Sequence, residues 1–344
     1  MEPVTHALMS LAIARAAQKR LPRFGTAMIV AAGVVADLDF VSYISGPGGF
    51  LRFHRTVLHS LLGTALMVCA IAWAFFVAAK KIPAKPTPNL KLSPPPQFKA
   101  AIIFCAIGAA GHLLLDLASG VGVQLLWPFH SEWFAWDILT NLDPWILVGL
   151  IAGLLLPLLF RLISDEIGDR KKKPTGVAAA IVTLSLLFAY MGVRAAFRGQ
   201  ATALLLSREF HKREPLSAGS FPYSTTPFEW RGVVMTDNTA ELVDVSTGAE
   251  KDFDPDRSIT RYKPDGSPAL EKAQSTAAAE QFLKYARFPI ANEARIEDGY
   301  RIEIRDLRFA PDDSGLDNIF VRVDLDSSLR VTSQGFRFAS SPAP

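Results

Sequence analysis

Five apolar segments of about twenty residues each constrain this chain most strongly. They run over approximately 24–45, 57–79, 98–119, 145–163 and 176–197. An α-helix needs about 20 apolar residues to cross a hydrocarbon core of about 30 Å. A sixth apolar segment, over about 4–18, is shorter. A buried core helix explains one such segment, but five in succession predict an α-helical integral membrane domain with five to six membrane segments.

Charge divides the chain into two parts. Residues 1–199 hold 18 basic and 10 acidic residues, whereas residues 200–344 hold 18 and 23. This shift predicts a polytopic membrane domain over 1–199, followed by a soluble domain over 200–344. In the second part, apolar and polar residues alternate over 231–246, 300–310 and 318–338, and one helix is expected over 269–286. The soluble domain is therefore expected to be small and α+β.

Loop charges predict the orientation. The loop 80–99 has five lysines, six prolines and no acid, and both RKKKP at 170–174 and the turn from Lys19 to Arg23 are basic. The positive-inside rule places these three in the cytoplasm. The loop 120–144 has no lysine or arginine and is expected to face outward, as is the 200–344 domain. Lipid headgroups and topology explain the basic residues, so we expect membrane lipid and not nucleic acid as a partner. Nothing in the sequence identifies a protein partner for the 200–344 domain.

Ionisable residues inside the apolar segments indicate a functional site. His112 and Asp116 are four residues apart in GHLLLDLASG, so a helix presents both on one face. Ionisable groups at membrane depth are costly and mark functional sites. The predicted topology brings further candidates to the same outer face: His6, Asp37, Asp39, His54, His59 and His130.

Imidazole and carboxylate groups are the usual ligands of zinc and similar divalent metals. A bound metal lowers the pKa of its water toward about 7, which supplies a hydroxide nucleophile. Either Asp37 or Asp39 is expected to be a further ligand or the general base, because an unbroken helix would point the two in nearly opposite directions. The residues expected to bind zinc, or else manganese, are His6, His54, His59, His112 and Asp116.

Two other residues are candidates for substrate binding. Arg55 either pairs with an acid or binds a substrate phosphate. His130, in WPFHSEW, is the second candidate, although loop histidines near aromatic residues are often interface residues.

The same residues allow other interpretations. The His112–Asp116 pair could be a polar clasp between helices in a structural or regulatory membrane protein. A metal-binding transport or sensing protein would use the cluster as a transit site. It would also need ionisable groups at depth near the inner face, which the sequence lacks.

Four motifs in order, PVTHAL, ADLDF, HRTVLHS and GHLLLDLASGVGVQLLWPF, resemble the YdjM-like family over about residues 1–165. Its members are bacterial inner-membrane proteins described as predicted membrane-bound metal-dependent hydrolases. The resemblance implies that the histidines and aspartates of these motifs hold the metal. The H-x-x-x-D pair is also similar to zinc-dependent phospholipase C and nuclease sites, which implies a phosphoester or lipid-linked substrate. The chain lacks an obvious second pair of this kind, which such a trinuclear site would need.

Overall fold

The computed structural model describes residues 1–82, 95–166, 176–248, 253–309 and 318–339. Most of the basic loop 80–99, and RKKKP at 170–174, lie outside these residues. The chain divides into two compact units. The helical unit contains Met1–Asp39, Arg55–Phe129 and Phe134–Arg194, and the sheet unit contains Phe40–His54, His130–Trp133 and Ala195–Pro344.

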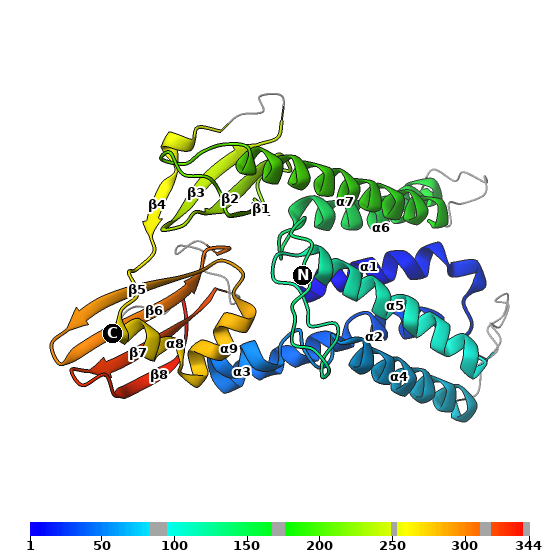
Figure 1. The fold of residues 1–344 in the computed structure, drawn as a ribbon. Helices are drawn as coiled ribbons and strands as arrows, with labels where there is room; N and C mark the ends of the chain where they lie inside the picture. The colour runs from blue at the N-terminus through cyan, green and yellow to red at the C-terminus, as the bar shows by residue number, and fades with distance from the viewer. Residues whose placement is uncertain (83–94, 167–175, 249–252, 310–317, 340–344) are drawn as a thin grey trace. The chain divides into compact units, whose positions relative to one another are not determined.

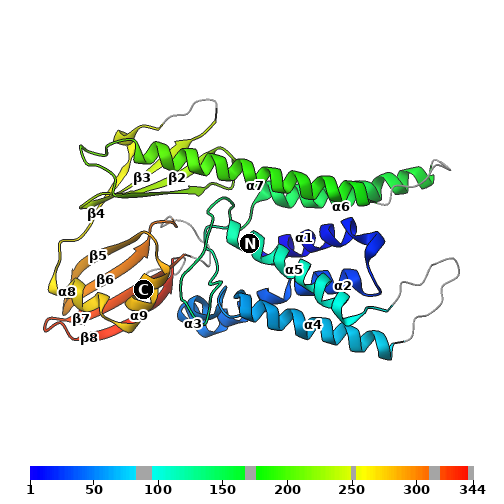
Figure 2. The ribbon, with the colours of Figure 1, turned by 45° about the vertical axis from the view of Figure 1, so that its right-hand side comes forward.

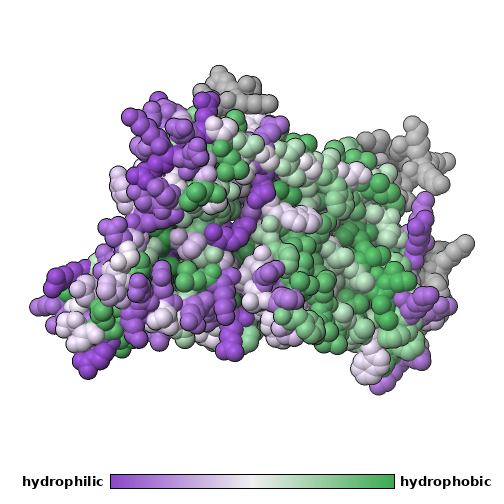
Figure 3. Space-filling view, in the orientation of Figure 1, coloured by the Kyte–Doolittle hydropathy of each residue, from purple (hydrophilic) through white to green (hydrophobic). Residues whose placement is uncertain are grey.

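The helical unit confirms the predicted membrane helices (Figure 1). Five stretches are long and apolar enough to cross a membrane: Gly25–Phe53, Leu61–Lys81, Phe98–Ala118, Pro144–Ser164 and Val177–Leu206. Their outward faces carry exposed apolar side chains, which give the helices their hydrophobic surface (Figure 3). The elements are α1 (Pro3–Ala16), η1 (Gln18–Arg20), α2 (Gly25–Ala32), η2 (Val35–Ser45), α4 (Leu61–Lys81), α5 (Phe98–Ala118), α6 (Pro144–Glu166) and α7 (Val177–Leu206), which ends in the sheet unit.

Local signals in the sequence fix where these helices begin. The Ser60 hydroxyl accepts a hydrogen bond from the Gly63 N–H at 3.0 Å and so caps α4. The Asp143 carboxylate accepts from the N–H groups of Trp145 and Ile146 at the start of α6. Both residue types are favoured at this position because the first N–H groups of a helix lack partners within it.

The apolar segment predicted over 24–45 is not one regular α-helix, because α2 ends at Ala32 and a 3-10 helix, η2, follows. In an α-helix the Gly33 carbonyl would accept from the N–H of Asp37. Here that N–H donates to Val34 O at 3.0 Å instead. The Gly33 carbonyl is thereby available to His112 Nδ1, at 2.9 Å. The break in the helix therefore creates an acceptor for a predicted site residue.

The sheet unit has two four-stranded antiparallel sheets (Figure 2). The predicted strands are confirmed as β2 and β3, β6, and β7 and β8. The helix expected over 269–286 is two helices, because the Thr276 hydroxyl accepts from the Ala279 N–H and starts a second one. The sheets are β1 (Ser217–Pro222), β2 (Glu229–Met235), β3 (Thr239–Ser246) and β4 (Ile259–Tyr262), then β5 (Pro289–Ile296), β6 (Gly299–Asp306), β7 (Ile319–Asp326) and β8 (Val331–Phe338); the helices are η3 (Pro255–Arg257), α8 (Pro268–Gln274) and α9 (Ala277–Tyr285).

Two short segments from the first half of the chain also belong to the sheet unit. The segment 40–54 contains α3 (Gly46–Phe53), which packs on β8. Within this contact the rings of Phe50, on α3, and Phe338, on β8, lie 6.4 Å apart. The segment 130–133 contributes Trp133, whose ring meets Tyr285 edge-on at 5.0 Å. The sheet unit is therefore built from three separate parts of the sequence.

Candidate functional site

Asp116, near the end of α5, is the centre of a buried polar cluster in the helical unit. Its Oδ2 lies 3.1 Å from Nε2 of His59 and 3.1 Å from Nε2 of His112. Its Oδ1 lies 3.4 Å from Nε2 of His6 and 3.2 Å from an Nη of Arg55. All of these side chains are almost completely buried. One carboxylate therefore joins residues from three separate segments of the chain: α1, the turn before α4, and α5 itself.

The outer ring nitrogens of two histidines are fixed by acceptors. Nδ1 of His112 donates to the Gly33 carbonyl at 2.9 Å, and Nδ1 of His59 lies 2.9 Å from Oδ2 of Asp39. The acceptor beside each Nδ1 favours the tautomer and ring orientation in which Nε2 faces Asp116. The two Nε2 atoms are 3.0 Å apart. Two nitrogen lone pairs and a carboxylate oxygen in such contact require a shared proton or a cation between them.

His6 and Asp37 complete this arrangement. The His6 ring stacks on His112 with centroids 3.8 Å apart, and neither of its ring nitrogens makes a hydrogen bond within the described part of the chain. Oδ1 of Asp37 lies 3.8 Å from Nε2 of His112. Four residues each place one potential ligand atom within 4.8 Å of the others, which suits a metal ion: His6, Asp37, His112 and Asp116.

The structure gives Asp37 and Asp39 different positions. Asp37 belongs to the group of potential ligands, whereas Asp39 lies on the far side of the His59 ring. Oδ2 of Asp39 also accepts from the backbone N–H of Arg55 at 2.9 Å. Asp39 thus orients a histidine from outside the cluster. The prediction that only one of the two aspartates binds metal stays a prediction.

Of the two interpretations of Arg55, the structure has the ion pair with an acid, Asp116. A second Nη of Arg55 donates to Oγ of Ser119 at 2.8 Å. Ser119 was not among the residues predicted from sequence, and neither were Gly33 and the α-amino group of Met1, which contacts Oδ1 of Asp116.

The cluster does not include His54 or His130. Both belong to the sheet unit, where the His54 ring stacks on Phe50 at 4.3 Å and meets Phe40 edge-on at 5.8 Å. His130 is exposed. The other three histidines, His6, His59 and His112, are instead buried beside Asp116.

Gly108 explains how the backbone of α2 comes so near to α5. A Cβ at this position would lie 2.1 Å from the carbonyl oxygen of Ile29, so only glycine fits. Gly108 precedes His112 by one helical turn, on the same face. The close approach brings the end of α2 within hydrogen-bonding distance of His112. A glycine one turn before a polar residue in a membrane helix is the sequence signal that would have indicated this contact.

The model of the YdjM inner membrane protein family matches residues 1–201. The match extends past the expected residue 165, through α6 and most of α7. No curated protein and no solved structure matches the chain.

Proposed function

Because the chain belongs to the YdjM inner membrane protein family, we propose that its buried cluster binds zinc or manganese and hydrolyses a phosphoester. The observation that supports this most directly is the convergence of two Nε2 atoms and Oδ2 of Asp116, at 3.0–3.1 Å from one another. Nδ1 of each histidine faces an acceptor, the Gly33 carbonyl or Asp39, which leaves both Nε2 atoms to bind a cation. A divalent metal satisfies all three atoms at once.

The side chains around the cluster would have distinct tasks. His6, His112 and Asp116, with His59 beside them, would hold the metal, which supplies a water of lowered pKa and polarises a phosphoryl oxygen. Asp39 and the Gly33 carbonyl keep the rings of His59 and His112 in place. Oδ2 of Asp37 makes no hydrogen bond within the described residues, and Asp37 is only partly buried.

A carboxylate oxygen without a hydrogen bond, on a side chain that is only partly buried, suits Asp37 to take a proton from an attacking water. Arg55 carries a guanidinium beside the cluster and can contact an oxygen of a substrate phosphate.

The location favours a substrate from the membrane. We place the cluster at the outer face of a bacterial inner membrane, because the Lys19–Arg23 turn at the other end of α1 is basic and the loop 120–144 has no basic residue. The basic segment at 170–174 precedes α7 and is expected in the cytoplasm. One crossing of the membrane by α7 therefore puts the 200–344 domain outside. A phospholipid or a lipid-linked headgroup would reach a site at this depth.

Metal content tests the proposal first. The full chain, purified in detergent, is expected to contain one or two zinc or manganese ions by elemental analysis. A His59→Ala/His112→Ala variant is expected to lose them, and a His54→Ala/His130→Ala variant to retain them. Metal-loaded protein is then assayed against a chromogenic phosphodiester and against phospholipids. Wild-type protein without metal would contradict the proposal and favour a polar clasp between helices.

Asp39→Asn is expected to lower zinc affinity about 10- to 100-fold without unfolding the protein, because the amide orients His59 less strongly than a carboxylate does. Isothermal titration with zinc measures the change. Asp324→Asn, which breaks a 2.8 Å ion pair with Arg301 in the sheet unit, is the matched control and should leave zinc affinity unchanged. Equal affinities of Asp39→Asn and wild type would mean that Asp39 does not orient a ligand.

A further inference from the structure

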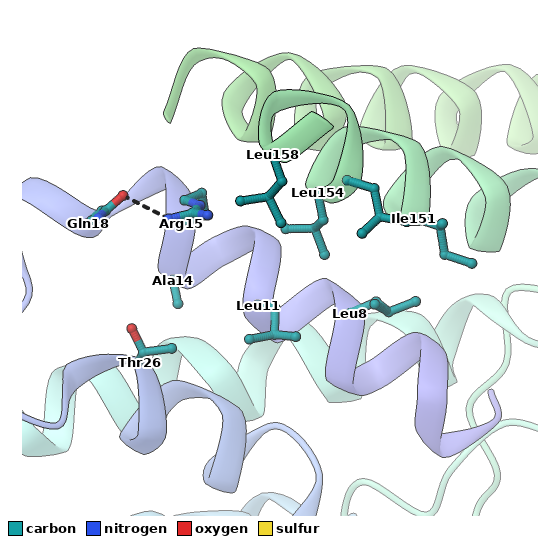
Figure 4. A pocket seen from close by; sticks show the side chains of 10 residues that line it. Leu8, Leu11, Ala14, Arg15, Gln18, Thr26, Ile151, Leu154 and Leu158 are labelled. Atoms are coloured by element: carbon teal, nitrogen blue, oxygen red, sulfur yellow. Dashed lines mark hydrogen bonds between the residues drawn. The ribbon is translucent and has the colours of Figure 1, made fainter. Parts of the chain in front are cut away.

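A second site lies between α1 and α6 in the helical unit, where the structure has a groove of about 500 Å³ (Figure 4). Leucines from both helices form its walls, with Leu8 and Leu11 on α1 facing Leu154 and Leu158 on α6. Leu11 and Leu158 are among the exposed large apolar residues, so the groove is open on the outside of the helices.

One end of the groove is polar. Arg15 and Gln18 line it there, and an Nη of Arg15 donates to Oε1 of Gln18 at 3.3 Å. Among the described residues Arg15 forms no ion pair, so its guanidinium has donors available. Arg15 follows His6 by nine residues on α1, which is about 14 Å along the helix axis. This polar end is therefore separate from the metal cluster.

Basic residues follow this end of the groove in the sequence. The exposed residues Lys19 and Arg20 follow directly on η1. Gly176, immediately before α7, is close enough that an added Cβ would lie 3.3 Å from Nε of Arg15. The first turn of α7 starts here, and the N-terminal end of a helix has a partial positive charge. All of these groups favour an anion.

We propose that the groove binds an acyl chain of an anionic phospholipid, with the lipid phosphate at Arg15. Leucine walls in a bilayer offer no hydrogen bonds to water, so an acyl chain fills the groove better than water does. Arginine suits a phosphate because its donors form a planar fork. A zwitterionic headgroup has the same phosphate but adds a positive amine, which the surrounding basic groups repel. Net negative lipids are therefore preferred, in the leaflet that meets the Lys19–Arg23 turn.

Native mass spectrometry of the full chain in detergent tests this preference, with dioleoyl phosphatidylglycerol and dioleoyl phosphatidylcholine titrated separately. We expect phosphatidylglycerol to bind at least about fivefold more tightly, and Arg15→Ala to remove that preference. Arg261→Ala, the control at an exposed position on β4 in the sheet unit, should change it less than about twofold. Metal content should be the same in all three proteins.

Filling the groove with a larger side chain tests whether the acyl chain of the lipid lies in it. Leu11→Trp and Leu158→Trp alter opposite walls, and each should weaken the binding of both lipids about tenfold or more. Leu66→Trp, at an exposed position on α4, should not. Circular dichroism verifies that each variant is folded, and either wall variant alone suffices. Equal binding of the two lipids, a preference that survives Arg15→Ala, or wild-type lipid binding in a folded wall variant would each overturn the proposal.

Discussion

Asp116→Asn is expected to reduce metal affinity at least about 100-fold and to destabilise the apo protein by about 3 kcal/mol. The oxygens of Asp116 contact three histidines and Arg55. Asparagine has nearly the same size but no charge, and its NH₂ group donates where a ligand must accept. It also leaves the buried guanidinium of Arg55 without its counter-charge. Metal analysis and thermal unfolding in detergent measure the two effects.

Asp143→Asn is the matched control for this experiment. Asp143 is also a buried aspartate in the helical unit, but it caps α6 instead of joining the cluster. Asparagine caps helices about as well as aspartate does, so metal content should stay close to that of wild type. If Asp116→Asn retained the wild-type metal content, Asp116 would not be a ligand.

Gly108→Ala is expected to lower stability by about 1–3 kcal/mol, because the added methyl group collides with the Ile29 carbonyl and pushes α2 away from α5. The hydrogen bond from His112 Nδ1 to Gly33 should lengthen as a result, so that zinc affinity falls about tenfold. Thermal unfolding followed by circular dichroism gives the first effect, and zinc titration the second.

Gly149→Ala provides the comparison, since a Cβ at this position on α6 meets nothing within 4 Å. Alanine forms helix better than glycine, so this variant should be as stable as wild type or more stable by up to about 1 kcal/mol. Equal unfolding temperatures for the two variants would show that α2 and α5 do not depend on close contact at Gly108.

The membrane helices and most strands could be predicted because apolar length and alternation are properties of the local sequence. The pairing of His112 with Asp116 was equally accessible, since helical spacing alone brings them together. The break after α2 was not. It leaves the Gly33 carbonyl to His112, which is 79 positions away in the sequence, and no local pattern shows that contact.

The two histidines of HRTVLHS illustrate the same limit within one motif. His54 caps the end of α3, and Arg55 has a φ of 58°, which turns the chain between the two histidines. His59 consequently reaches Asp116, whereas His54 stacks on Phe50. Sequence identifies both as chemically able to bind metal, but the direction of the chain at Arg55 decides which of them reaches the cluster.

The position of Asp116 in the sequence has a consequence for how the protein is made. The cluster takes its side chains from α1, η2, the turn before α4, and α5, and Asp116 is the last of its acids and histidines to be synthesised. His6, Asp37 and His59 have no common partner until α5 enters the bilayer. Insertion of α5 is therefore the step that assembles the cluster, and it can precede the synthesis of α6 and α7. Every predicted ligand is synthesised by residue 116 of 344, so the cluster can assemble before α6 and α7 are made.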